Sequence, residues 1–367
     1  MTAEPMLGAQ MEELDLFYHE VRQAHSRPLW LLGDENLTID PKPRTVAFLW
    51  RWQDLWPLMY RAARLIPVEQ AERRVLVFAN PGLQGRGSAT ATLMANLQII
   101  NPGEVARTHR HTPSAFRLIV ERTGAYTAVE GEKTYMDLGD FITTPSWTCH
   151  DHGNEGTDPM VWLDGLDVPL VNHLEVGFYE QYQEERQPLT KSDELSLRLY
   201  GAGTLTPTWQ RHQSIHSPLL NYKWERSYEA LSRLAVESDG SPHDGLCVEY
   251  TNPTTGGPAL ATMACFAHLL KPGMHTKAHR HTGSTVYHVI SGKGYSVIAG
   301  QRFSWEEKDT FVVPSWAWHE HVAHVESCLF SYNDSPVLRP FGLYREEAYS
   351  ENDAYQPVTG VFLSAMA

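Results

Sequence analysis

The chain has 367 residues, of which 42% are hydrophobic and 20% charged, a composition typical of globular proteins and long enough for two or three domains. Lys and Arg number 30 against 44 Asp and Glu, a formal net charge of -14 that argues against an extended nucleic-acid interface. No apolar run approaches the ~20 residues of a membrane helix, and the acidic N-terminus lacks a secretory signal. The four cysteines show no CxxC spacing, so we expect a soluble, cytoplasmic chain with reduced thiols and no membrane partner.

Residues 1–66 are predicted to form a helical N-terminal arm. Apolar residues recur at helical spacing over 11–24 and again over 54–65. From about Arg73 the chain changes to short β-branched runs separated by Gly, Pro and Asn, which is typical of closely connected strands in a sandwich or barrel. Residues 181–240 are polar and interrupted by Pro and Gly, and we interpret them as a linker with one helix over 222–236.

The strand-rich part of the chain repeats itself. The stretch PGEVARTHRH at 102–111 returns as PGMHTKAHRH at 272–281, and DFITTPSWTCHDH at 140–152 returns as DTFVVPSWAWHEH at 309–321. The offset between the copies changes by only one position from the first pair of stretches to the second. A repeat this regular predicts two copies of one β domain, over 67–180 and 241–345, followed by a C-terminal tail over 346–367.

Histidines concentrate in the repeated stretches, where four HxH pairs hold eight of the 18 in the chain. His109 and His111 are two residues apart on a predicted strand, so both imidazoles leave the same face, and His150 follows a Pro-containing turn that can return it beside them. A single HxH pair on a strand is usually a pair of surface or core histidines that bind no metal. The repetition of the pair in this chain favours metal binding. Three imidazoles with no fourth protein ligand leave positions open, as a catalytic metal site requires. The second copy offers a candidate second site in His279, His281 and His319.

These motifs resemble those of the cupin family. The first copy has the glycine, histidine, proline and asparagine positions of both cupin motifs: Gly103, His109, His111, Gly124, Gly139, Pro145, His150 and Asn154. The second copy keeps the pattern except that Lys308 replaces a Gly and Ala323 replaces the Asn. The resemblance implies a bicupin, an all-β protein with accessory helices whose one chain forms two antiparallel β-barrels of jelly-roll type.

A narrower resemblance covers the chain from about Pro67 to Tyr344. The stretches HRHTPSAFR, PSWTCHDH and WLDGLDVP resemble gentisate 1,2-dioxygenase and its salicylate and 1-hydroxy-2-naphthoate relatives. That family implies Fe(II)-dependent cleavage of gentisate by O2 between C1 and C2 to maleylpyruvate, in aromatic catabolism, by a homotetramer. Alternatives are salicylate or 1-hydroxy-2-naphthoate as the substrate, a metal-dependent isomerase or decarboxylase, or a non-catalytic bicupin that binds metal or a small anion. Three imidazoles could also hold Mn, Co or Zn.

One departure from the general cupin pattern concerns charge. Most metal-binding cupins carry a Glu where this chain has Arg117, and Tyr287 in the second copy. A site of three histidines without a carboxylate keeps the full charge of a divalent metal, which suits an anionic aromatic hydroxy acid that chelates through two oxygens. Arg117 could pair with the substrate carboxylate or form a salt bridge at the rim. The family resemblance supports the substrate role and assigns Arg73 to the same pocket.

The sequence allows two roles each for His152 and Asp164. His152 lies two residues after His150, so it shares that face of the strand. It could assist deprotonation of the substrate hydroxyl, or it could be a supporting or solvent-facing residue. Asp164 could anchor a metal ligand or Arg117 from behind, or could cap the end of its strand.

Three further residues are predicted to shape the pocket. Gln98 matches a pocket position of the family, and Met94 and Asn96 share its face by the two-residue period of a strand. The salicylate-cleaving relative has a bulkier Trp at the position of Met94, and this difference favours gentisate.

Overall fold

The computed structural model describes all residues except 1–3, 34–36, 204, 206, 210–213 and 365–367, so these parts of the predicted arm, linker and tail lie outside the described residues. The chain divides into two compact units, Met1–Lys42 and Pro43–Ala367. The first unit contains helix α1 (Glu4–Gln23), which includes most of the helix predicted over 11–24, and the short helix α2 (Leu29–Leu32). Within this unit, the indole Nε1–H of Trp30 donates to the Tyr18 hydroxyl over 3.1 Å.

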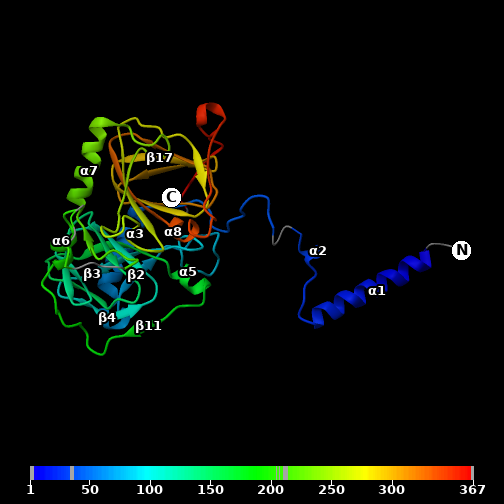
Figure 1. Cartoon of the computed structure of the whole chain (residues 1–367), viewed down its shortest axis with the longest axis horizontal. Helices are drawn as coiled ribbons and strands as arrows, with labels where there is room; N and C mark the ends of the chain where they lie inside the picture. Colours follow the sequence, from blue (N-terminus) through cyan, green and yellow to red (C-terminus); the bar gives the residue numbers. More distant parts are fainter. Residues whose placement is uncertain (1–3, 34–36, 204, 206, 210–213, 365–367) are drawn as a thin grey trace. The chain divides into compact units, whose positions relative to one another are not determined.

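The second unit contains two domains, each built from two β-sheets (Figure 1). The strands of the first domain are β2 (Arg74–Val77), β3 (Met94–Ile100), β4 (Val105–His111), β5 (Ala115–Glu121), β6 (Ala125–Val129), β7 (Glu132–Met136), β8 (Phe141–Thr144), β9 (His150–Asn154), β10 (Met160–Leu166), β11 (Tyr179–Gln181) and β12 (Asn221–Tyr222). They form one sheet in the order β12-β8-β5-β10-β3-β2 and a second in the order β11-β4-β9-β6-β7.

The second domain repeats this plan with one added strand, β23, at the edge of a sheet. Its strands are β1 (Phe48–Trp50), β13 (Leu246–Glu249), β14 (Ala264–Leu270), β15 (His279–His281), β16 (Thr285–Ser291), β17 (Lys293–Ile298), β18 (Gln301–Glu306), β19 (Thr310–Val313), β20 (His319–Ala323), β21 (Ser327–Asn333), β22 (Glu346–Ala348) and β23 (Gly360–Val361). Their orders are β1-β19-β16-β21-β14-β13 and β22-β15-β20-β17-β18-β23. The pairs between named strands are antiparallel, apart from a parallel pairing of β18 with β23.

Strand β1 and the tail strands differ from the predicted organisation. β1 lies in the range predicted as a helical arm, yet Phe48, Leu49 and Trp50 pair with β19 of the second domain. Leu49 is buried there in an apolar cluster with Phe303 and Phe311. Aromatic side chains favour a strand at a half-buried sheet edge, so the tertiary context overrides the helical pattern around them. β22 and β23, in the predicted tail, likewise extend a sheet of the second domain.

The largest apolar cluster lies between the two domains. Strand β5 shows why: Phe116, Leu118 and Val120 belong to this shared cluster, together with Phe330 and other residues of the second domain. Ile119, on the opposite face of the strand, packs inside the first domain. Because alternate residues of a strand point to opposite faces, burial on both faces requires the near-continuous apolar run AFRLIVE. Arg117 interrupts that run on the inner face.

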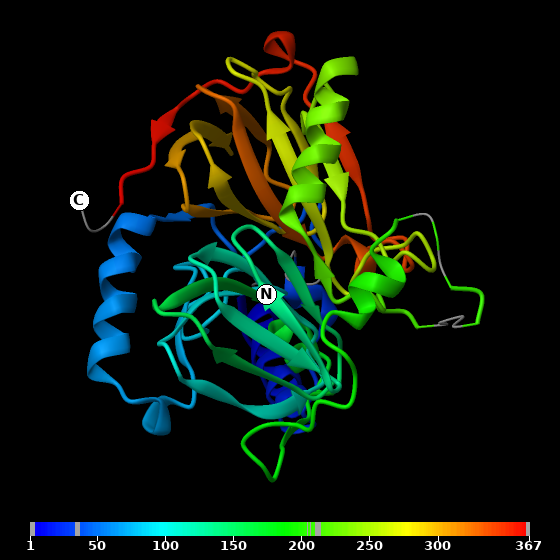
Figure 2. The same ribbon diagram turned by 90° about the vertical axis from the view of Figure 1, so that its left-hand side faces the viewer.

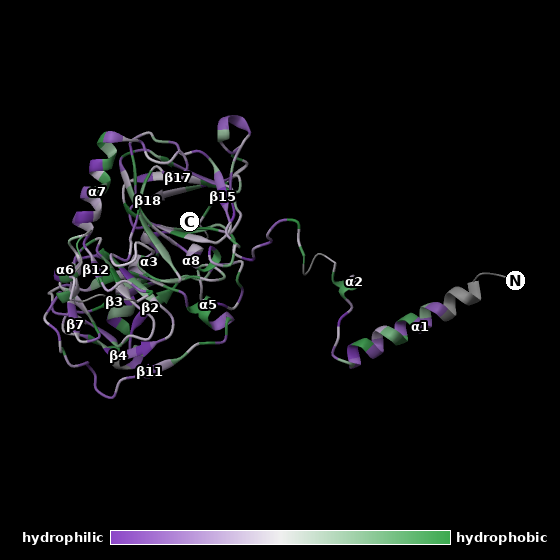
Figure 3. Cartoon of the chain, viewed as in Figure 1, coloured by the Kyte–Doolittle hydropathy of each residue, from purple (hydrophilic) through white to green (hydrophobic). Residues whose placement is uncertain are grey.

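Each domain carries one helix against an equivalent pair of strands. Helix α3 (Trp52–Leu65) contacts β2 and β3, and helix α7 (Trp224–Glu237) contacts β13 and β14. In Figure 2 the green helix α7 runs along the yellow strands of the second domain. Polar and apolar residues alternate along its ribbon in Figure 3, as in an amphipathic helix that buries one stripe. The remaining helices are the short α4 (Val68–Ala71), α5 (Val168–His173), α6 (Leu195–Tyr200) and α8 (Ser335–Leu338), with a 3-10 turn at Asn352–Ala354.

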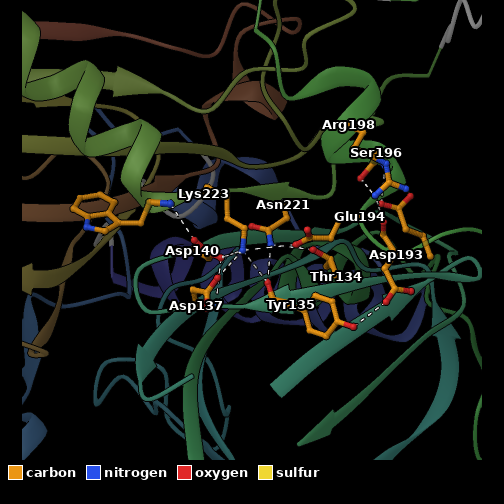
Figure 4. Close-up of polar contacts among 12 residues, drawn as sticks. Thr134, Tyr135, Asp137, Asp140, Asp193, Glu194, Ser196, Arg198, Asn221 and Lys223 are labelled. Carbon is orange, nitrogen blue, oxygen red and sulfur yellow. Dashed lines mark hydrogen bonds and ion pairs between the residues drawn. The ribbon is translucent and has the colours of Figure 1, made fainter. Parts of the chain in front are cut away.

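The segment before α7 is fixed to the first domain by polar contacts (Figure 4). The Lys223 ammonium donates to Asp140 Oδ2 over 2.7 Å and to Asp137 Oδ2 over 2.9 Å. The Asn221 amide donates to Thr134 Oγ1 over 2.9 Å, next to the pairing of β12 with β8. This part of the predicted linker therefore completes a sheet of the first domain before the chain enters the second.

Candidate metal centre and active site

Three histidines of the first domain converge on one point. His109 and His111 lie on β4, and His150 lies on β9 directly opposite His109. One ring nitrogen from each lies within 4.8 Å of the others, a grouping that can hold a metal ion. We call this group the first triad. The strand register thus produces the arrangement that the i, i+2 spacing and the later histidine predicted.

Backbone carbonyls orient all three rings of the first triad. The Nδ1 atoms of His109, His111 and His150 lie 2.9, 2.7 and 2.9 Å from the carbonyl oxygens of Arg107, Pro113 and Thr148. A carbonyl oxygen can only accept, so each Nδ1 carries the proton and each Nε2 keeps its lone pair. Such outer contacts fix the tautomer of metal-binding histidines. His150 Nε2 is buried and has no hydrogen-bond partner among the described residues, which fits a metal ligand.

The three rings are neutral at ordinary pH. Burial, with a further contribution from the charge of Arg73, lowers the pKa of His109 to about 3. Burial lowers the pKa of His111 to about 4, and it places the pKa of His150 well below the usual value. Only a neutral imidazole can bind a metal ion. Because desolvation lowers the pKa values of the three rings, protons do not compete with a metal for their nitrogens at ordinary pH.

A cavity of about 560 Å³ opens beside the first triad, between the two sheets of the domain. This volume lies within the range of small-molecule sites. Its wall contains His111 and His150 together with the predicted pocket residues Arg73, Met94, Asn96, Gln98, Arg117 and Asp164. The cavity wall therefore contains all predicted residues of the first site except His109 and His152, and His109 joins the site through the first triad and its contact with Arg73.

Arg117 lies in a polar row that crosses the inner face of one sheet. The strand register places Asp164 of β10 directly opposite both Arg117 of β5 and Asn96 of β3. Arg117 Nε lies 3.5 Å from Asp164 Oδ1, and Arg117 Nη1 donates to Thr144 Oγ1 over 2.5 Å. Burial raises the pKa of Asp164 to about 6 and lowers that of Arg117 to about 10. Arg117 is only 4% exposed, so it belongs to the interior and not to a salt bridge at the rim.

Arg73 makes a direct contact with the first triad. Its Nη1 donates to His109 Nε2 over 2.6 Å, from a position just before β2. The Nε2 lone pair can serve the guanidinium or a metal ion but not both, because each needs the same pair of electrons. Metal binding therefore requires Arg73 to turn away from His109, and the guanidinium then remains beside the cavity it lines.

His152 lies next to His150, with ring centroids 5.7 Å apart, and is not one of the residues that line the cavity. It is buried against Trp162, and its Nδ1 lies 3.0 Å from Thr127 Oγ1. Its Nε2 is buried without a partner among the described residues, and burial lowers its pKa well below the usual value. The ring is therefore neutral, and one of its nitrogens is left to form a further hydrogen bond.

Sequence reasoning missed an aromatic edge of the site. Tyr179 on β11 pairs with His111 of β4, and its ring stacks on that of His109 with centroids 5.7 Å apart and planes at 26°. Tyr179 and Phe178 are exposed and line the mouth of the cavity. They stand at the end of the range predicted as the first domain, 67–180, just before the segment interpreted as a linker, where no alternating apolar pattern marks a strand. In the sequence, only the presence of two aromatic residues in a polar stretch could have indicated that they belong to the site.

The second domain holds a second triad at the equivalent positions of the repeat. His279 and His281 lie on β15 and His319 lies opposite His279 on β20, with one ring nitrogen from each within 4.8 Å of the others. His319 Nδ1 donates to the Ala317 carbonyl over 3.0 Å, and its Nε2 is buried without a partner among the described residues. The predicted ligand set therefore converges here too.

Comparison with known proteins identifies the fold of both domains. A cupin-domain model matches the chain over residues 96–167 and again over 267–329. The chain is 41% identical over 345 residues to gentisate 1,2 dioxygenase 1 of Aquipseudomonas alcaligenes, covering 94% of this chain and 98% of the relative. It is 39% identical over 357 residues to the 5-aminosalicylate 1,2-dioxygenase of a Comamonas species, covering 95% and 94%. A crystal structure of salicylate 1,2-dioxygenase from Pseudaminobacter salicylatoxidans matches with a TM-score of 0.86 and 35% identity, covering 91% of this chain and 97% of that chain.

Two cupin domains in one chain define a bicupin protein, so the predicted fold class is confirmed. The chain belongs to the family of gentisate, salicylate and 1-hydroxy-2-naphthoate 1,2-dioxygenases, and it is a ring-cleaving oxidoreductase. The alternatives, among them a non-catalytic bicupin, are no better supported. Within the described ranges, no helix is both long and apolar enough to cross a bilayer.

Proposed function

We propose that the protein is an Fe(II)-dependent gentisate 1,2-dioxygenase that cleaves gentisate (2,5-dihydroxybenzoate) with O2 between C1 and C2 to give maleylpyruvate. The observation that carries this proposal is the convergence of three neutral imidazole nitrogens beside a cavity lined by two arginines. The similarity to a gentisate 1,2 dioxygenase over nearly the whole chain supports this choice of substrate.

The first triad fits a ferrous ion. His109, His111 and His150 would hold it through Nε2, and the bound ion would supply the redox chemistry between the electron-rich ring and O2. The cavity beside the three histidines would receive the substrate, whose carboxylate and 2-hydroxyl oxygens would serve as further ligands of the bound ion.

The two arginines orient the substrate in this proposal. Arg117 is held by Thr144 and Asp164, so its guanidinium is already positioned when an anion enters the cavity. Arg73, once it has turned away from His109, adds a second positive charge for the carboxylate. Charge-assisted hydrogen bonds of this kind give both affinity and a defined orientation.

We assign the proton of the substrate's 2-hydroxyl to His152. Its buried Nε2 without a partner among the described residues supports this role, and Thr127 holds the ring from the other side. Met94, Asn96 and Gln98 would set the shape of the pocket around the ring and so the choice among hydroxybenzoates.

The test is oxygen uptake by the full chain reconstituted with Fe(II) under anaerobic conditions. The substrates are gentisate, salicylate, 5-aminosalicylate and 1-hydroxy-2-naphthoate, each with O2 consumption and ring-opened product followed together. We expect the highest kcat/KM with gentisate and no activity in His111→Ala. A preference for salicylate or 1-hydroxy-2-naphthoate would select the alternative substrate, and the absence of ring cleavage with all four would refute the proposal.

The predicted homotetramer and cytoplasmic location belong to the proposal as well. Helix α1 in the unit Met1–Lys42 exposes Met11, Leu14, Leu16 and Phe17, and exposed apolar side chains of this size favour a protein contact. Light scattering of the full chain gives the oligomeric state directly: a mass of four chains supports the tetramer, and a monomer contradicts it.

A further inference from the structure

One wall of the cavity in the first domain is a sheet whose outer face belongs to the contact between the domains. Strands β3, β5 and β10 place Met94, Arg117 and Asp164 on the cavity side. Alternate residues of the same strands, among them Phe116 and Gly165, face the other way, and Phe116 packs against the second domain. A residue of the second domain can therefore act on the cavity wall from its outer side.

Tyr332 of β21 makes such a contact. Its hydroxyl donates to the Met94 carbonyl over 2.8 Å, across the boundary between the domains. The Tyr332 side chain is fully buried, and its ring meets the ring of Phe116 edge-on, with centroids 4.8 Å apart and planes at 79°. Burial raises the pKa of Tyr332 well above its usual value, so the hydroxyl keeps its proton and stays a donor. The first residue of β3 is thus tied to the second domain.

The repeat cannot make the same contact in the other direction. Tyr332 pairs with Val286 of β16, and Gly165 pairs with Phe116 of β5. Val286 and Phe116 hold the same place in the repeat, each at the second position of its strand, so Tyr332 and Gly165 are equivalent positions. A glycine has no side chain that could donate to a carbonyl. The support therefore runs from the second domain to the first.

The tie matters because of where Met94 lies in its sheet. The pairing of β2 with β3 spans Asn96 to Ile99, and Met94 lies beyond its end. On the other side Met94 pairs with Leu166 of β10, which also lines the cavity. The hydroxyl of Tyr332 thus holds β3 at the point where the strand begins and where its side chain shapes the cavity.

We propose that Tyr332 is a positioning residue for the site in the first domain: it holds the Met94 backbone, and so fixes the width of the cavity and the choice among aromatic hydroxy acids. Specificity is a difference between the affinities for two ligands, and a wall that yields admits the bulkier ligand at a lower cost. The inference rests on the proposed function only in taking this cavity as the substrate site.

The first experiment measures the dissociation constants of gentisate and of the bulkier 1-hydroxy-2-naphthoate by calorimetry. The full chain is loaded with Zn²⁺, which has no redox chemistry, so that no turnover occurs. Tyr332→Phe removes only the hydroxyl and keeps the ring against Phe116. We expect the ratio of the two constants to shift about 3- to 10-fold in favour of 1-hydroxy-2-naphthoate.

The same titrations distinguish positioning from a loss of structure. A variant that is only partly folded would show a lower binding stoichiometry with both dissociation constants unchanged, and this result would overturn the proposal. An equal ratio in the wild type and Tyr332→Phe would also overturn it, as would the binding of neither acid to the wild type.

Tyr222→Phe is the matched control. The Tyr222 hydroxyl donates to the Thr251 carbonyl over 2.7 Å, and its ring packs against the same apolar cluster between the domains. Tyr222 is not one of the residues that line the cavity, so its variant should keep the wild-type ratio. A shift as large as that in Tyr332→Phe would mean a general effect of the domain contact and would contradict the proposal.

The second experiment tests whether the effect passes through Met94. In Met94→Ala the side chain that Tyr332 positions is absent, so adding Tyr332→Phe should change the ratio less than it does in the wild type. Additive effects of the two substitutions would refute this route. Neither experiment needs ring cleavage, so this inference and the proposed oxidation of gentisate can fail independently.

Discussion

Arg117 and Asp164 form a buried ion pair on the wall of the cavity. Each charge in such a pair depends on the other, because an isolated charge in the interior is strongly destabilising. The guanidinium also donates to Thr144, so its plane is fixed relative to the first triad. The pair therefore maintains a positive group in the interior of an acidic protein, at the place where a carboxylate would bind.

Replacement of Arg117 by Lys tests its role in binding. Lys keeps the positive charge beside Asp164 but loses the planar fork that holds a carboxylate through two hydrogen bonds. A charge-assisted hydrogen bond contributes about 1.5–3 kcal/mol, so kcat/KM for gentisate should fall roughly 10- to 100-fold, mainly through KM. Steady-state kinetics measure the effect. Arg110→Lys is the control, because Arg110 pairs with Glu180 on the outer face of β4. Equal kinetics in the wild type and Arg117→Lys would contradict the binding role.

His288 is a second buried residue whose charge state matters, in this case for stability. It is 2% exposed on β16, and its Nδ1 lies 2.9 Å from Thr310 Oγ1. Burial, assisted by the charge of Lys308, lowers its pKa to about 3. The unfolded chain takes up this proton near pH 6.5, so between pH 6.5 and 3 the unfolded state binds more protons than the folded state.

The free energy of unfolding should therefore decrease as the pH falls through this range. One pKa unit corresponds to about 1.4 kcal/mol, so between pH 7.5 and pH 5 the wild type should lose about 2 kcal/mol more than His288→Asn. Denaturant unfolding at the two pH values measures both losses. His25→Asn, at an exposed position, should keep the wild-type dependence. If the wild type and His288→Asn lose the same free energy of unfolding between the two pH values, His288 is not the source of the pH dependence.

At the scale of the element, strand β10 illustrates how a glycine permits close packing beside the site. Gly165 follows Asp164 and pairs with Phe116 of β5. A Cβ atom at Gly165 would lie 2.1 Å from Phe116 Cζ. Phe116 is fully buried in the cluster between the domains and contacts Phe330 and Tyr332, so its ring has no space into which it can move.

Gly165→Ala should therefore destabilise the protein by overpacking. The expected loss in the free energy of unfolding is about 1–3 kcal/mol, measured by denaturant titration. Gly257→Ala is the matched control, since the nearest atom to a Cβ there is Thr255 Oγ1 at an ordinary 3.5 Å. Similar stability of the two variants would show that the Phe116 ring can move aside to make room for the added methyl group.

At the scale of the whole molecule, two equivalent hydrogen bonds connect the domains. Thr92, just before β3, donates through Oγ1 to Asp334 Oδ2 over 2.6 Å, and Asp334 Oδ1 accepts from the Ser284 amide. Thr262, the counterpart of Thr92 in the repeat, donates in the same way to Asp167, which accepts from the Ser114 amide. The repeat therefore produces a reciprocal pair of contacts that positions each domain against the other.

Thr92→Val should weaken this connection, because it removes the donor and leaves one oxygen of a buried carboxylate unsatisfied. We expect the free energy of unfolding to fall by about 1–3 kcal/mol, and Thr92→Ser, which keeps the hydroxyl, to retain most of the stability. Thermal or denaturant unfolding of the three proteins gives the comparison. A Val variant as stable as the Ser variant would mean that water replaces the lost donor.

The candidate metal ligands could be predicted because metal binding requires fixed residue types at fixed local spacing. His109 and His111 share a face of any strand, and the repeat placed His150 and His319 in equivalent turns. Helices α1, α3 and α7 and most strands could also be predicted, from the local spacing of apolar residues and from short β-branched runs. The location of β1 was not, since so short a strand at a sheet edge depends on the neighbour it pairs with.

By itself, the sequence determined two copies of one β domain, the two histidine triads and the face on which Met94, Asn96 and Gln98 lie. Only the tertiary structure decided that Asn96, Asp164 and Arg117 form one row, that Arg73 reaches His109, and that Tyr332 of the second domain reaches Met94. The physical reason is the range of the interactions. Alternation along a strand is a local property of the backbone, whereas the register between strands and the path of the connecting loops depend on packing between residues far apart in the chain.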